Sequence, residues 1–189
     1  DTLSYAATGM PSTLSMSTSG TISGTPVNAD VGAHTIIVTA TDSSSAAATA
    51  SDTYILTVTN TNDAPTATAI SDASTAEDAA YSLDVSGNFA DVDVGDTLSY
   101  AATGMPSTLS MSTSGTISGT PVNADVGAHT IIVTATDSSS AAATASDTFV
   151  LTVTNTNDAP TVSSAISDAS TAEDSAYSLD ISGNFADVD

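Results

Sequence analysis

The residues best suited to bind a ligand stand in the segment NFADVDVGDTLSY, residues 88–100, where Asp91, Asp93 and Asp96 fall within six positions. The chain has 22 acidic residues and no Lys or Arg, so its formal net charge is −22. Carboxylates at this spacing repel one another unless a cation lies between them. Calcium takes about six to eight oxygen ligands, which makes this segment a candidate calcium site. The alternative is that these aspartates only form turns by bonding to their own backbone, and we favour it for Asp96 and Asp125.

Composition narrows the classes of partner and activity. A chain without Lys or Arg repels nucleic acid and anionic lipid, and it has no run of about 18 apolar residues for membrane insertion. It has no Cys, and His34 and His129 each open a predicted strand without a second His nearby, so we expect no transition-metal site. The nucleophile pattern G-x-S-x-G is absent, and we do not expect an enzyme.

An internal repeat dominates the sequence. Residues 1–53 recur unchanged at 96–148, a shift of 95 residues, and the motif TNTNDAP ends each copy. A period of this length is one small domain, and an Asn/Asp cluster followed by Pro is a natural boundary. The predicted parts are the C-terminal part of one repeat (1–65), a complete repeat (66–160) and the N-terminal part of the next (161–189).

Apolar residues alternate with polar ones in every segment that could position the carboxylates. In HTIIVTATD, Ile131, Val133 and Ala135 share one face, and in TFVLTVTNT the inward residues are Phe149, Leu151 and Val153. Such alternation of β-branched residues between Gly, Pro, Asn and Asp turns predicts strands. About seven short strands in each repeat is typical of an Ig-like sandwich. Residues 138–146 are predicted to be a loop or a frayed edge strand.

Several segments together resemble a known family. VTATD…LTVTNTNDAP resembles the cadherin signature of a V-x-A-x-D strand followed by a final strand and an Asn/Asp-Pro linker. ADVDVGDTLSY resembles the cadherin D-x-D-x-G segment, and GTISGTPVNADVGAHTIIVTATD looks like the dystroglycan-type cadherin, or putative-Ig, repeat of large bacterial surface proteins and adhesins. The resemblance implies an all-β fold of Ig-like (cadherin-like) Greek-key β-sandwich repeats in tandem, with Ca²⁺ where consecutive repeats meet.

The resemblance also implies a ligand set for each junction. This chain has Asn where the family linker usually begins with Asp, and it lacks the family's L-D-R-E segment, which implies weaker or fewer ions. The implied ligands at the first junction are Asn60, Asn62, Asp63, Asp91, Asp93 and Asp137. Those at the second junction are Asn155, Asn157, Asp158, Asp187, Asp189 and Glu77.

Near-identical repeats favour a structural spacer in an extracellular or cell-surface fibre or adhesin, rigidified by calcium. The alternative is a carbohydrate-binding module, although such modules usually expose aromatic residues and this chain has no Trp. The expected partners are neighbouring copies, head to tail, and cell-surface or polysaccharide ligands. Residues 161–189 contain the opening strands that residues 1–65 lack. Two successive copies could complete one sandwich, or the sequence could be a window on one longer repetitive chain.

Overall fold

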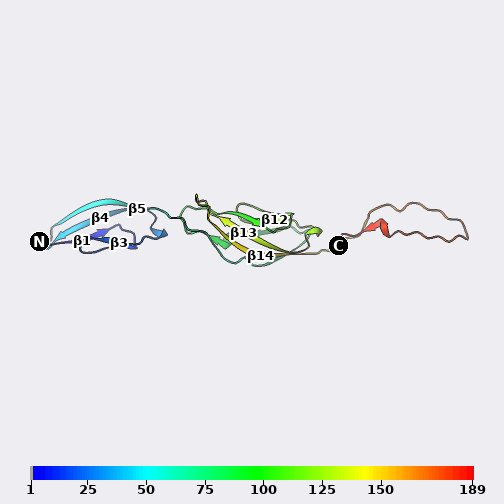
Figure 1. The fold of residues 1–189 in the computed structure, drawn as a ribbon, viewed down its shortest axis with the longest axis horizontal. Helices are drawn as coiled ribbons and strands as arrows, with labels where there is room; N and C mark the ends of the chain where they lie inside the picture. The colour runs from blue at the N-terminus through cyan, green and yellow to red at the C-terminus, as the bar shows by residue number, and fades with distance from the viewer. Residues whose placement is uncertain (1) are drawn as a thin grey trace. The chain divides into compact units, whose positions relative to one another are not determined.

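The computed structural model describes residues 2–189. All regular structure in these residues consists of β-strands and short 3₁₀ turns (Figure 1). The chain divides into two compact units. The first unit contains the residues up to Pro65 together with Ala90–Leu98 and Asp137–Ala143. The second unit contains Thr66–Phe89, Ser99–Thr136 and Thr144–Asp189.

Two sheets form the sandwich of the second unit. One sheet has the order β10 (Ser99–Thr103), β13 (Gly127–Thr136), β14 (Thr144–Thr154) and β7 (Ala73–Ala76). The other has the order β11 (Leu109–Met111), β12 (Thr116–Gly119) and β8 (Tyr81–Asp84). All neighbouring strands are antiparallel except β14 and β7, which run parallel. The predicted Ig-like β-sandwich is therefore confirmed.

The core follows the alternation of the sequence. In the long hairpin of β13 and β14, Ile131 lies opposite Phe149 and both are fully buried. Val133, Leu151 and the other residues predicted to point inward are also buried, because a strand places every second side chain on the same face. Residues 138–146 were predicted to be a loop or a frayed edge strand. Residues 138–143 form a turn without a strand, and β14 begins at Thr144.

Glycine sets the turn that follows β10. Gly104 has φ +80°, and a Cβ at this position would collide with the backbone carbonyl of Thr130 on β13. Residues with a side chain rarely adopt this left-handed conformation. Gly104 therefore lets the chain leave the sheet close to β13.

The first unit repeats part of this arrangement. Its larger sheet has the order β1 (Leu3–Thr8), β4 (Gly32–Asp42) and β5 (Thr49–Val58). Its smaller sheet pairs β2 (Leu14–Met16) with β3 (Ile22–Gly24). Gly32 lies opposite Val58, as Gly127 lies opposite Val153 in the second unit. No counterpart of β7 or β8 lies beside β5 or β3 in the described sheets.

Two short strand pairs and four 3₁₀ turns complete the regular structure of residues 2–189. β6 (Thr66–Ala67) pairs with β9 (Phe89–Ala90), and β15 (Thr161–Val162) pairs with β16 (Phe185–Ala186). The 3₁₀ turns are η1 (Asn28–Asp30), η2 (Ser86–Asn88), η3 (Asn123–Asp125) and η4 (Ser182–Asn184). Residues 161–189, coloured orange to red in Figure 1, otherwise form a long loop.

Candidate cation sites

The turn after β9 brings three carboxylates together in the first unit. Oxygen atoms of Asp91, Asp93 and Asp96 all lie within 4.8 Å of one another. The Asp93 backbone N–H donates to Asp91 Oδ1 at 2.9 Å, and the Asp96 N–H donates to the Asp93 carbonyl at 3.3 Å. Aspartate turn chemistry is therefore present, but it also directs the three carboxylates toward a common point.

The linker residues join this cluster. The Asp63 backbone N–H donates to Asp93 Oδ2 at 2.8 Å. The Asn62 side-chain amide donates to Asp137 Oδ2 at 3.0 Å and to the Asp63 carbonyl at 2.9 Å. Five of the six residues predicted for the first junction are thus close together, whereas Asn60 is exposed.

Asp137 is buried at the end of β13 and held by several donors. Its Oδ1 accepts from the backbone and hydroxyl of Ser139 and from the Ala143 N–H. The hydrogen bond from Asn62 is the largest of the effects that lower the pKa of Asp137, and those from Ser139 and Ala143 add to it against the opposing effect of burial. Asp137 therefore remains an anion beside the linker at neutral pH.

Two members of the first cluster were not predicted from the sequence. Asp96 was interpreted as a turn residue, yet its Oδ2 is buried beside Asp91 and Asp93. Asn28 is not among the residues predicted from the sequence, and its amide nitrogen lies 2.9 Å from Asp63 Oδ2 and 3.5 Å from Asp93 Oδ1. Asn28 stands in the segment PVNADVG, and in the second copy of that segment the sequence pointed only to Asp125, as a turn residue.

Several buried oxygens of this cluster lack a hydrogen-bond partner. They are Asp91 Oδ2, Asp96 Oδ2 and Asn62 Oδ1. An ionised carboxylate and an amide oxygen can only accept, and an unpaired buried acceptor costs about 1–3 kcal/mol. The chain has no Lys or Arg that could supply the missing charge. Hard oxygen donors without His or Cys fit Ca²⁺ or Mg²⁺, and a set rich in protein carboxylates fits Ca²⁺ better.

A second acidic cluster lies in the second unit. Oxygen atoms of Glu77, Asp78 and Asp158 lie within 4.8 Å of one another. Glu77 is buried, and its Oε1 accepts from the Thr156 backbone N–H at 2.9 Å. Its Oε2 is buried without a partner. This cluster therefore presents the same kind of unpaired acceptor as the first one.

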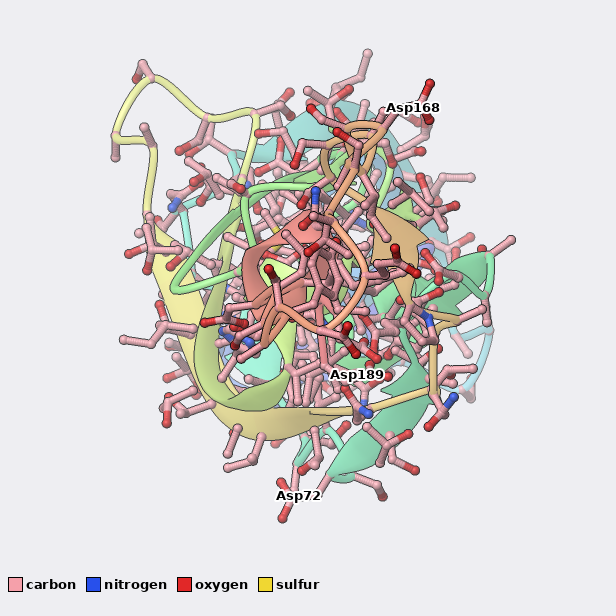
Figure 2. The ribbon with its side chains drawn as sticks, turned by 90° about the vertical axis from the view of Figure 1, so that its right-hand side faces the viewer. Asp72, Asp168 and Asp189 are labelled. Atoms are coloured by element: carbon pink, nitrogen blue, oxygen red, sulfur yellow. The ribbon has the colours of Figure 1, made fainter. Side chains whose placement is uncertain are left out.

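The remaining residues predicted for the second junction lie near Asp158 or in solvent. The Asp158 backbone N–H donates to Asp189 Oδ2 at 2.7 Å, and the Asp189 N–H donates to Asp187 Oδ1 at 3.3 Å. Asp189 is labelled in Figure 2. These bonds repeat the contacts of Asp63, Asp93 and Asp91 at the first cluster. Asn157 donates to the Asp158 carbonyl at 2.8 Å, and Asn155 is exposed.

Asp125 has the structural role that the sequence favoured. Its Oδ2 accepts from the Thr108 hydroxyl at 2.6 Å and from the Val122 backbone N–H at 3.1 Å. The Thr108 hydrogen bond is the main cause that lowers the pKa of Asp125. His129 Nε2 lies 2.7 Å from the Asp125 carbonyl, and no His belongs to either acidic cluster within residues 2–189.

Comparison with known proteins agrees with this architecture. Residues 1–59 and 64–154 match the family model described as "Putative Ig domain", and the chain belongs to this family. No curated protein matches the sequence. None of the described helices is long and apolar enough to cross a membrane.

Solved cadherin structures share the fold. The protocadherin γB4 extracellular domain is 22% identical over 84% of this chain and 29% of its own, with a TM-score of 0.59. Mouse cadherin-23 EC22–24 is 18% identical over 85% of this chain and 57% of its own, with a TM-score of 0.58. Drosophila N-cadherin EC1–4 is 21% identical over 81% of this chain and 41% of its own, with a TM-score of 0.56. The chain thus spans less than two thirds of the length of these structures.

The comparisons define a class rather than an activity. The protein is a tandem repeat of the putative Ig family, and its fold is cadherin-like. Its acidic clusters could hold a metal ion.

Proposed function

We propose that the chain is a spacer of an extracellular or cell-surface fibre or adhesin, in which Ca²⁺ stiffens the linker at each repeat boundary. One observation carries the proposal. The first cluster combines Asn62 and Asp63, which precede Pro65, with Asp91, Asp93 and Asp137, which follow it. The side chains on the two sides of the linker meet only in one arrangement of the backbone.

The chemistry of the cluster supports calcium as the ion. Its donors are carboxylate and amide oxygens, several of them buried and unpaired. Without a cation, three carboxylates around one point repel each other, and this repulsion favours opening of the turn that contains Asp91, Asp93 and Asp96. A bound cation would remove that repulsion and give the unpaired oxygens a partner. We infer the same role for Glu77 and Asp158 in the second cluster.

Stiffness follows from the placement of the donors. The Asn62 amide already holds the linker to Asp137, and the Asp63 backbone holds it to Asp93. An ion held by the same residues would add bonds that break when the linker rotates. Two acidic residues beyond the predicted set, Asp96 and Asp78, would contribute charge to the first and second cluster.

Calcium titration of the full chain tests the proposal. We expect saturable binding by calorimetry at neutral pH. We also expect X-ray scattering that a single conformation fits in calcium but that needs an ensemble of conformations in EDTA. Asp91→Asn should weaken binding at the first cluster about tenfold or more, because an anionic ligand is lost. Asp84→Asn is the matched control, since Asp84 belongs to neither acidic cluster and accepts from the Ser86 N–H.

Three results would count against the proposal. The first is the absence of calcium binding by the parent chain. The second is an identical scattering profile in calcium and in EDTA. The third is equal weakening of calcium binding by Asp91→Asn and Asp84→Asn, which would indicate a general effect of net charge.

A further inference from the structure

One face of the larger sheet in the complete repeat is turned to solvent and carries no charge. In the hairpin of β13 and β14, which Figure 1 labels, the side chains that alternate with the buried ones point outward. We call this surface the threonine face. It consists of every second residue of β10 from Ser99, of β13 from Ala128 and of β14 from Thr144, and all of them are Thr, Ser, Ala, Ile or Val.

The nearby carboxylates lie off the threonine face. Asp147 is the acidic residue within β14, but it shares the inward register of Phe149 and accepts from the Ile70 N–H at 2.6 Å. The outer face of the smaller sheet, by contrast, contains Asp84 on β8, which is exposed. Of the two outer faces of this sandwich, the threonine face is therefore the neutral one, on a chain whose net charge is −22.

Some hydroxyl groups on the threonine face already have partners within the sheet. Thr134 Oγ1 and Ser146 Oγ lie 2.8 Å apart on neighbouring strands and share a hydrogen bond. The Ser99 hydroxyl donates to the Thr136 carbonyl at 3.4 Å. A polar group that keeps its hydrogen bond costs little when a partner excludes water from it. These hydroxyls can therefore be covered without being left unpaired.

An apolar residue stands at the centre of the threonine face. Ile132 lies on the central strand between Thr103 on β10 and Thr148 on β14, and it is 44% exposed. Each neighbouring Thr also presents a methyl group, and β-branched side chains pack well on a pleated surface. Covering this centre would remove apolar surface from water, which favours association.

The first unit presents the same face. The outward residues of β1, β4 and β5 are identical to those of β10, β13 and β14, except that Ile55 stands where the complete repeat has Val150. At the centre, Ile37 lies between Thr8 and Thr53 and is 43% exposed. The neutral face is therefore a property of the repeat and occurs twice in this chain.

We propose that the threonine face is an interface at which two copies of this chain pack face to face. Two chains of the same strong charge repel each other, and the repulsion is weakest where the facing surfaces carry no carboxylate. A second copy is the partner that brings an equally neutral face of matching shape, and one patch can pair with itself about a twofold axis. Face-to-face packing of two sheets is an established arrangement in proteins.

The size of the face determines the expected strength. Strands about 4.8 Å apart and up to 11 residues long give roughly 400 Å² for the three strands. Two such faces bury roughly 800 Å² in total, which is less than the about 1,200–2,000 Å² of a stable interface. One pair of faces should therefore associate weakly, and successive repeats should strengthen the contact by acting together.

Sedimentation equilibrium of the full chain tests the proposal. EDTA is present throughout, so that no divalent cation can bridge carboxylates of two chains. We expect the mass to rise above the 18.5 kDa of the monomer as concentration increases. Association should be several-fold stronger in about 1 M than in about 0.05 M NaCl, because salt screens the repulsion between the chains.

A pair of double variants locates the contact. Ile37→Asp/Ile132→Asp places like charges opposite each other and should weaken association about tenfold or more. Val27→Asp/Val122→Asp is the matched control, since these valines are 53% and 42% exposed and lie outside the threonine face. It adds the same charge and should reduce association far less. Circular dichroism confirms that both variants are folded.

Cross-linking gives a second measurement that needs no added charge. The chain has no Cys, so single cysteines can be introduced and joined with a short bifunctional maleimide. Thr148→Cys lies on the threonine face, and Ser110→Cys lies on the exposed side of β11 in the other sheet. The covalent dimer should form several-fold faster with Thr148→Cys.

Four results would overturn the proposal. A parent chain that stays monomeric at every concentration and salt would leave the face to a partner of another kind. Association that weakens with added salt would indicate attraction between charges instead. Equal loss of association in the two double variants would indicate a general effect of charge. Equal cross-linking rates of the two cysteine variants would place the contact elsewhere.

Discussion

Replacing Glu77 by Gln should have opposite effects on stability with and without calcium. Glu77 is buried between the Thr156 N–H and two other acidic residues, with one carboxylate oxygen unpaired. Without calcium, Gln removes a repelling charge, keeps an acceptor for Thr156 and adds donors toward Asp78 and Asp158. With calcium, the same change removes an anionic ligand. The variant should therefore be more stable than the parent in EDTA and less stable in calcium.

The expected gain in stability of Glu77→Gln in EDTA follows from the spacing of the carboxylates. Two charges separated by the 4.8 Å limit of the cluster interact by about 3 kcal/mol at an effective dielectric constant of about 20. Asp78 is exposed and Asp158 is half-buried, so solvent screens most of this repulsion. We therefore expect a net gain of about 1 kcal/mol in EDTA. For a domain of this size, that corresponds to a rise in Tm of roughly 4–8 °C.

The assay is thermal unfolding followed by circular dichroism, with parent and variant each measured in EDTA and in saturating calcium. Glu173→Gln is the matched control, because Glu173 is the counterpart of Glu77 in the last segment and is exposed. It should leave Tm unchanged in both buffers. A loss of stability of the same size for Glu77→Gln in EDTA and in calcium would refute the reasoning, because it would mean that Glu77 serves only as a hydrogen-bond acceptor.

Two more predictions concern the stability of the β-sandwich in the complete repeat. Gly104→Ala should lower the free energy of unfolding by about 3 kcal/mol in urea denaturation, because of the left-handed φ and the collision with β13. Gly87→Ala, at a site with open space, should have little effect, and equal losses would contradict this explanation. Thr108→Val should raise the pKa of Asp125, whose folded value is lowered from 3.8. The stability that this carboxylate contributes is present above pH about 4 and is lost as the pH falls. Acid unfolding of Thr108→Val should therefore begin at a higher pH than that of the parent. Thr108→Ser keeps the hydroxyl, so its acid unfolding should begin at the same pH as that of the parent.

The fold could be predicted because it depends on local patterns. Period-2 alternation predicts the buried faces of β13 and β14 correctly, since a strand has only two faces. The exact repeat identified which segments are equivalent. The pairing of strands is harder to predict from the sequence. Nothing local in the sequence of β7 (Ala73–Ala76) indicates that this strand lies parallel to β14.

The site was only partly predictable for a related reason. Asp91 and Asp93 are close in sequence, so their proximity in space could be expected. Asn28 reaches the same cluster from a 3₁₀ turn 63 residues away from Asp91, and a tertiary contact of this kind has no local signature. Asp96 was assigned to turn chemistry because a turn and a ligand cluster use the same residue types, and only the burial of its Oδ2 distinguishes them.

The exactness of the repeat has a consequence for how the protein folds. Residues 81–84 pair with residues 116–119 in the folded protein, but residues 21–24 have the identical sequence TISG. During folding, no difference in side chains between these two segments favours the correct one. Discrimination must then come from chain connectivity, that is, from the shorter loop to β12. Concentrated refolding removes this advantage, because strands of neighbouring molecules compete on equal terms, so exchange of strands between chains is the characteristic misfolding route of such an array.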